Sequence, residues 1–138
     1  MKTRIKWIEN VAFMAESGSG HAMVMDGAIE GGGKNLGPRP MEMLLMGMGG
    51  CSAYDVVHIL RKGRENIEGV EVDITAERAD SDPKVFTKIH MHFKVMGAGL
   101  TDKKVGRAVE LSADKYCSAS IMLGKTAEVT HSFEILAS

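Results

Sequence analysis

The two cysteines, Cys51 and Cys117, are the residues of this 138-residue chain best suited to covalent chemistry. A cysteine thiolate is a nucleophile, and two thiols that lie close together can form and break a disulfide. The two cysteines are 66 positions apart, and each is followed by a serine, in GGCSAYD and KYCSAS. Because two cysteines do not make a disulfide scaffold, we consider them as a reactive pair of thiols, with two inert core residues as the alternative.

The other residues that can bind metals do not favour a metal site or a cofactor. The sequence contains no C-x-x-C, and no Cys or His lies at zinc-finger spacing. His90 and His92 share one face of an expected strand, where a solvated polar face explains them as well as a metal site does. His21 and His58 have no partner that the sequence identifies. We therefore expect neither metal nor cofactor.

Two further residues lie beside the cysteines in the sequence. Asp55 follows Cys51 by four positions, so it would share the same helix face, and a carboxylate there would raise the thiol pKa and oppose activation. The favoured interpretation is that Asp55 caps or pairs elsewhere in a dimer. Tyr116, next to Cys117, is expected to pack in the core.

Length and composition indicate one globular domain, residues 1–138. The chain is 44% hydrophobic and 25% charged, with a net charge of −1, which argues against nucleic acid or an anionic membrane as the main partner. No run of about 18 apolar residues is apparent, and the first ten residues lack the apolar core of a signal peptide. We therefore expect no membrane span and a cytoplasmic protein.

The sequence pattern predicts an α+β fold in the order βββ-α-ββ-α(α)-β. Three strands (2–9, 11–17 and 21–26) form an antiparallel meander, followed by a glycine- and proline-rich loop over 27–40. Strands 69–79 and 84–97 form a hairpin, and a helical region over 100–125, capped by Thr101, bends near Cys117. A last strand covers 127–136. Mostly antiparallel sheet with helices on one face is the expected architecture.

A long helix over about 41–63 is expected to carry Cys51. Pro40 and Glu42 suit its first turn, and RKGR suits its end. Its first half contains four methionines and three glycines, and each glycine costs about 1 kcal/mol in a helix interior. Methionine fills irregular apolar space, so a soft helical core is favoured over an adaptable ligand pocket.

Three segments of the chain resemble one protein family. They are PRPMEMLLMGMGGCSAYDVVHIL, VFTKIHMHFKV and LSADKYCSAS, and they are similar to the OsmC/Ohr family of osmotically induced and organic-hydroperoxide-resistance proteins, in its small uncharacterised OsmC-like branch. The resemblance implies an intertwined homodimer, with sheet around two long central helices. It also implies a thiol peroxidase that reduces organic hydroperoxides with an external thiol or dithiol. By position, Cys51 matches the peroxidatic cysteine and Cys117 the resolving cysteine.

The resemblance also identifies candidate activating residues. Characterised members carry Glu directly after the proline that opens the helix, whereas here Met41 follows Pro40 and the carboxylate is Glu42. Arg39 is the nearest match to the family's activating arginine, and Arg4 is the other candidate.

Activation of Cys51 requires a nearby cation. Lowering a thiol pKa by two units needs about 2.7 kcal/mol, and one cation at about 4 Å supplies roughly 4 kcal/mol. Glu42 is about 13 Å from Cys51 along one helix, and Arg39 is further away. We therefore expect the partner subunit to supply these residues, in a two-fold dimer whose helices cross near Met46 and Gly47.

Two other functions remain open from the sequence. One is a non-catalytic binding protein with a methionine-lined apolar pocket and incidental cysteines. The other is a redox sensor that cycles between two thiols and a disulfide without efficient turnover.

Overall fold

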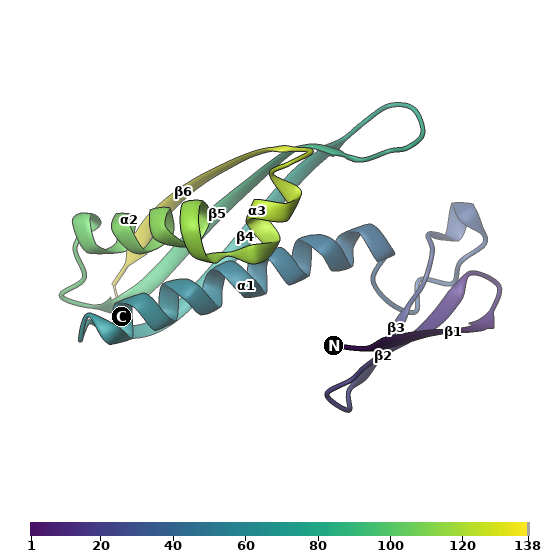
Figure 1. Cartoon of the computed structure of the whole chain (residues 1–138), viewed down its shortest axis with the longest axis horizontal. Coiled ribbons are helices and arrows are strands. Elements are labelled where there is room, and N and C mark those ends of the chain that lie inside the picture. Colours follow the sequence, from purple (N-terminus) through teal and green to yellow (C-terminus); the bar gives the residue numbers. More distant parts are fainter. Residues whose placement is uncertain (138) are drawn as a thin grey trace. The chain divides into compact units, whose positions relative to one another are not determined.

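The computed structural model describes residues 1–137 of the chain (Figure 1). These residues form two compact units, one over Met1–Met46 and one from Gly47 onward, and each is described by itself. Mixed α and β structure with two three-stranded sheets confirms the predicted α+β class. The single domain over 1–138 and the homodimer stay predictions.

The first unit is built on the predicted meander. Strands β1 (Thr3–Glu9), β2 (Ala12–Ser17) and β3 (Ala22–Met25) form an antiparallel sheet in the order β1-β2-β3. Tight turns join the strands, and Asn10 turns the first one with a left-handed φ of 48°. A short 3₁₀ turn, η1 (Ile29–Gly31), interrupts the expected loop.

Asp26 holds this loop together from a buried position. Its carboxylate accepts hydrogen bonds from the backbone N–H groups of Gly27 (2.7 Å), Lys34 (3.0 Å) and Leu36 (3.1 Å). Burial opposes the ionised form, but these N–H donors and the charge of Arg39 outweigh it and lower the pKa of Asp26. The glycine-rich loop therefore has a defined path to the helix that follows it.

Helix α1 (Pro40–Lys62) confirms the predicted long helix, and Pro40 is its first residue. The Glu42 carboxylate accepts a hydrogen bond from the backbone N–H of Arg39 at 2.8 Å, so it satisfies one of the donors exposed at the start of the helix. Arg61 and Lys62 lie in the last turn, where positive charge favours the helix end.

The expectation of no membrane span bears on this helix, and it stays a prediction. By length and composition, α1 can cross a membrane, because an 18-residue window has a mean hydropathy of 1.4. Glycines and charged residues interrupt the apolar residues of this segment, so the sequence shows no unbroken apolar run even though the average hydropathy is high. One such helix is weak evidence, since the core helix of a soluble protein passes the same test, but only 28% of the window is buried within the described chain. Much of α1 therefore has no cover from its own chain.

The second unit contains the sheet that supports the cysteines. Strands β4 (Asn66–Arg78) and β5 (Phe86–Ala98) form the predicted antiparallel hairpin, and β6 (Glu128–Leu136) completes the order β4-β5-β6. β6 runs parallel to β5, with Phe93 opposite Phe133. The parallel pairing follows from the helical crossover between these two strands.

Helices cover one face of this sheet (Figure 1). Every second side chain of β5 is buried beneath them, and the core also includes residues of α1 and α2; its members are Phe86, Ile89, Met91, Phe93, Val95, Met48, Val56, Leu60, Val105 and Val109. Of the four methionines expected in a soft helical core, Met48 is fully buried, whereas Met46 is 49% exposed and Met41 and Met43 are partly exposed. On the alternate positions of β5, His90 and His92 pair with Thr130, Ser132 and Glu134 of β6.

The helical region after β5 bends where it was predicted to bend. Helix α2 (Asp102–Leu111) is capped by Thr101, whose hydroxyl accepts from the Lys104 N–H at 3.3 Å. A π-helical turn, η2 (Ser112–Tyr116), follows, and α3 (Ser118–Leu123) begins after Cys117. The expected core packing of Tyr116 is wrong, because the wide turn ends there and Cys117, with an extended backbone, enters the core instead. Tyr116 is 51% exposed.

Candidate redox-active site

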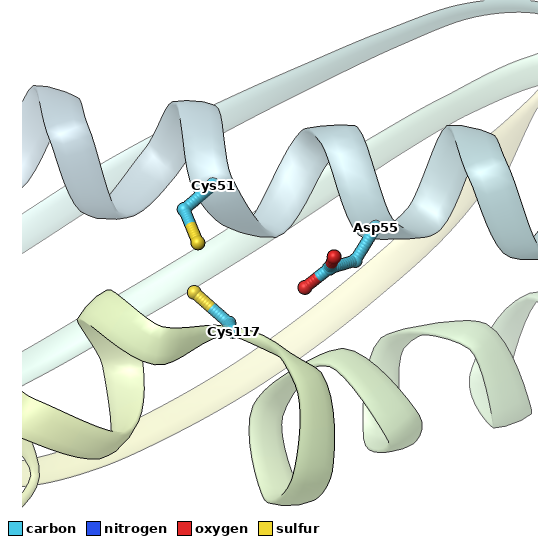
Figure 2. A group of neighbouring side chains, drawn as sticks. All are labelled: Cys51, Asp55 and Cys117. Carbon is cyan, nitrogen blue, oxygen red and sulfur yellow. The ribbon is translucent and has the colours of Figure 1, made fainter.

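The two thiols lie side by side in the second unit (Figure 2). Cys51 projects from the middle of α1 and Cys117 from the residue just before α3, and both are free cysteines. Their sulfur atoms and one carboxylate oxygen of Asp55 all lie within 4.8 Å of one another. Side chains from two distant parts of the sequence therefore form one cluster.

One of the glycines beside Cys51 explains how α1 approaches the sheet. A Cβ atom on Gly49 would lie 2.8 Å from Cδ1 of Ile74 on β4, closer than normal contact. Gly47 and Gly50 are exposed, and a Cβ on either would meet no atom of the described chain within 4 Å. Gly49 thus serves packing within the chain, whereas Gly47 and Gly50 leave the outer side of the helix open.

Cys117 is completely buried and surrounded by hydrogen-bond donors. Its sulfur accepts from the hydroxyls of Ser52 and Ser120, each at 3.1 Å, and from the backbone N–H of Ser120 at 3.3 Å. Burial raises the pKa of this thiol, but the donors of Ser120, Ser52 and Cys51 outweigh burial, so the pKa of Cys117 is lowered. Cys117 is therefore the thiol of the pair that ionises first.

Cys51 has the opposite electrostatic environment. It is partly exposed, and partial burial is the main cause that raises its pKa. The hydrogen bond and charge of Cys117, together with the charge of Asp55, raise the pKa further, and the backbone N–H of Ala119 only partly compensates. The effect anticipated for Asp55 is thus present. Within this chain, the more accessible thiol is therefore the one whose pKa is raised.

Three serines organise the cluster, and sequence reasoning assigned them no role. Ser112 donates from its hydroxyl to Oδ2 of Asp55 at 3.0 Å and so orients the carboxylate. Ser52 donates from its hydroxyl to the sulfur of Cys117, and its oxygen lies 3.2 Å from the hydroxyl oxygen of Ser120. The sequence contains one signal for this arrangement, the serine directly after Cys51, but Ser112 and Ser120 reach the site only through the turn geometry around Cys117.

The expected activating residues lie in the first unit with partners of their own. Glu42 binds the backbone of Arg39, and the Arg39 guanidinium donates to Oδ1 of Asn35 at 2.7 Å and to the carbonyl of Gly37 at 3.2 Å. Arg4, the other candidate, forms an exposed ion pair with Glu16 at 3.7 Å. Action of Glu42 or Arg39 on a thiol of the partner subunit stays a prediction.

Two cavities bear on the expected methionine-lined pocket. A cavity of about 350 Å³ in the first unit is lined by Met23, Met25 and Met43, among other residues. A larger cavity of about 640 Å³ reaches Asp55, and its lining in the described chain contains no methionine; it includes His58, Ile59, Lys104, Arg107 and Tyr116. Methionines therefore line a cavity in the first unit, whereas the cavity that reaches Asp55 is lined by charged residues of both signs.

The similarities of the chain to known proteins agree with this fold. The model of a family described as OsmC-like protein matches residues 31–132. This chain belongs to the OsmC-like family. The matched residues include α1, both sheet strands that follow it, and both cysteines.

Relatives of this OsmC-like protein cover its whole length. Protein YhfA of Escherichia coli strain K12 is 51% identical over 137 residues, which is 99% of each chain. A hypothetical protein from Aquifex aeolicus has a TM-score of 0.87 at 26% identity, over 99% of this chain and 96% of that one. An organic hydroperoxide resistance protein OsmC from Legionella pneumophila shares the fold, with a TM-score of 0.71 and 16% identity over 97% of each chain.

Proposed function

We propose that this OsmC-like protein is a thiol-dependent peroxidase that reduces organic hydroperoxides to alcohols. The observation that supports it is the pair of free thiols within 4.8 Å, one partly exposed and the other buried, with a lowered pKa. Membership of a family that includes organic hydroperoxide resistance proteins gives further support. We also propose that the protein works in the cytoplasm as a homodimer, without nucleic acid, membrane or cofactor.

In the first step, the Cys51 thiolate attacks the outer oxygen of the hydroperoxide. An S–O bond forms as the O–O bond breaks, the alkoxide takes up a proton and leaves as the alcohol, and Cys51 becomes a sulfenic acid. Cys51 is suited to this step because its sulfur is the accessible one. The peroxide is reduced by two electrons and the sulfur is oxidised by two.

In the second step, the Cys117 thiolate attacks the sulfenic sulfur of Cys51. An S–S bond forms, and hydroxide leaves and is protonated to water. The donors around Cys117 favour this step, since they stabilise the thiolate form of the attacking sulfur. An external thiol or dithiol then reduces the disulfide by exchange and is itself oxidised.

The partner subunit supplies the cation that Cys51 needs. Within one chain, the charges of Asp55 and Cys117 oppose ionisation of Cys51. The outer face of α1 carries Gly47, Gly50 and Tyr54, all exposed, and this face suits close contact with a second copy of the helix. In such a two-fold crossing, Arg39 and Glu42 of one subunit approach Cys51 of the other.

The direct test measures peroxide consumption by the purified, reduced protein. With an alkyl hydroperoxide and excess dithiol, we expect turnover by the wild type and a loss of roughly two orders of magnitude or more in Cys51→Ser. Cys117→Ser should instead accumulate a sulfenic acid that dimedone traps. Ser118→Ala, which changes an exposed neighbour of Cys117, is the control and should keep full activity. Turnover that survives Cys51→Ser would exclude the proposal.

The two alternative functions give different results in the same experiment. A redox sensor would form the Cys51–Cys117 disulfide stoichiometrically, without turnover in the presence of dithiol. A non-catalytic binding protein, with a ligand in the cavity lined by Met23, Met25 and Met43, would keep both thiols free after peroxide treatment.

A further inference from the structure

The geometry of the thiol cluster points to a second use of the same residues. We propose that, in the reduced protein, Cys51, Asp55 and Cys117 bind a thiophilic divalent cation such as Zn²⁺. The inference concerns the reduced resting state, and it shares the two cysteines with the proposed function but requires no peroxide chemistry.

The three side chains have the composition and spacing of a zinc site. Cys51 and Asp55 are four residues apart on one face of α1, and Cys117 faces them from the start of α3 (Figure 2). The three ligand atoms lie within 4.8 Å of one another. Around a tetrahedral zinc ion, with Zn–S near 2.3 Å and Zn–O near 2.1 Å, ligand atoms are separated by roughly 3.6–3.8 Å. Small side-chain rotations therefore suffice to bring all three onto one ion.

Neighbouring groups already orient two of the three ligands. Ser52 and Ser120 direct three hydrogen bonds at the sulfur of Cys117, and donors of this kind commonly support a metal-bound thiolate. Ser112 holds Oδ2 of Asp55 at 3.0 Å. One oxygen of this carboxylate is thus held by the protein, and the other is free to bind a cation.

Charge and access both suit a cation here. Two thiolates and a carboxylate would place three negative charges in a partly buried cluster, which is costly unless a cation compensates them. Cys117 is buried, whereas Cys51 and Asp55 are both partly open to solvent and provide a route of entry. Three protein ligands leave a fourth tetrahedral position for water.

A bound ion would compete with oxidation. Both sulfurs would be engaged with the metal, so neither could attack a hydroperoxide as a free thiolate. Zinc would then inhibit the proposed peroxidase, and removal of the metal would restore its activity. Asp55 is the residue that separates the two roles, because it binds the metal but takes no part in forming the disulfide.

The test is a titration of the reduced, metal-free protein with Co²⁺ and Zn²⁺ under anaerobic conditions. We expect one Co²⁺ per chain with a sulfur-to-cobalt charge-transfer band, which Zn²⁺ displaces. Asp55→Asn should raise the dissociation constant about 10- to 100-fold, and Cys117→Ser should abolish the band. Asp114→Asn, which removes an exposed carboxylate of the adjacent turn, is the matched control and should bind like the wild type. Equal affinity in Asp55→Asn and wild type, or no charge-transfer band, would overturn the inference.

Thiol counting after peroxide treatment separates this inference from the proposed function. Metal-free wild type and Asp55→Asn should both lose their two free thiols to peroxide, and Zn²⁺ should protect only the wild type. Oxidation of both thiols without metal binding would exclude the zinc site and would still support the peroxidase proposal. Metal binding by a protein whose thiols resist peroxide would exclude the peroxidase proposal and support the zinc site.

Discussion

Cys117 is the member of the cysteine pair with the lowered pKa, because three donors point at one buried sulfur. The donors act on the charged form, so they lower the pKa of Cys117 even though burial raises it. Cys51 is four residues from the carboxylate of Asp55 and faces the charge of Cys117, and its pKa moves the other way. The neighbours of these two chemically identical side chains thus shift their pKa values in opposite directions.

Removal of one donor should shift this balance. In Ser120→Ala the hydroxyl is lost and the backbone N–H remains, so the pKa of Cys117 should rise toward the ordinary thiol value. The ultraviolet absorbance of the thiolate, followed against pH in the metal-free protein, measures the change. Ser118→Ala is the control, since its side chain is exposed. An unchanged titration in Ser120→Ala would show that the hydroxyl does not hold Cys117 ionised.

Asp26 gives a prediction on the pH dependence of stability. Its pKa in the folded state lies below the unfolded value of about 3.9, so its contribution to stability is present above that value and is lost as the pH falls through the folded-state pKa. Asp26→Asn should therefore lower Tm at pH 7, and the difference from wild type should narrow in acid. Thermal unfolding at both pH values measures this difference.

The exposed Asp80 provides the matched control for that experiment. Asp80→Asn removes a carboxylate of the same type from a surface turn and should leave Tm unchanged at both pH values. If Asp26→Asn lowers Tm by the same amount at neutral and acid pH, the charge of the carboxylate does not stabilise the loop.

At the scale of elements, the three glycines of α1 lie within four residues and have two different environments. Gly49 lets the helix lie against Ile74 of β4, whereas Gly47 and Gly50 face outward with no neighbour in the described chain. An exposed helical glycine costs about 1 kcal/mol relative to alanine, with no benefit inside the subunit. We attribute the outward glycines to close contact between two copies of α1.

Gly50→Ala tests this attribution directly. Within one chain the alanine meets open space, so it should stabilise the helix by up to about 1 kcal/mol. If two helices cross there, the added methyl separates them and the dimer dissociation constant should rise, which sedimentation at decreasing concentration measures. Gly31→Ala, also in open space but in the 3₁₀ turn, should not change association. A dimer of unchanged strength in Gly50→Ala would place the crossing elsewhere.

At the scale of the whole molecule, we propose that two subunits share each active site. Cys51→Ser and Arg39→Ala should each be inactive alone, but a heterodimer contains one site with an intact Cys51 and an intact Arg39 from the partner. Mixing equal amounts, with dissociation and reassembly, should recover about a quarter of the wild-type activity. Peroxide consumption before and after mixing measures the recovery. No recovery, with heterodimers verified by mass spectrometry, would exclude action of Arg39 across the interface.

The sequence by itself determined the order of elements and pointed to the two cysteines as candidate reactive residues. Periodicity predicted the meander, the long helix, the hairpin and the bend near Cys117, because each depends on local patterns and turn residues. Only the tertiary structure decided the direction of strand pairing, the exposure of Tyr116 and the surroundings of Cys117. β6 lies parallel to β5 because of the crossover, and Tyr116 turns outward at a π-helical turn. The lowered pKa of Cys117 depends on Ser52 and Ser120, whose hydroxyls both contact one sulfur, and such convergence is a property of three-dimensional packing rather than of spacing along the chain.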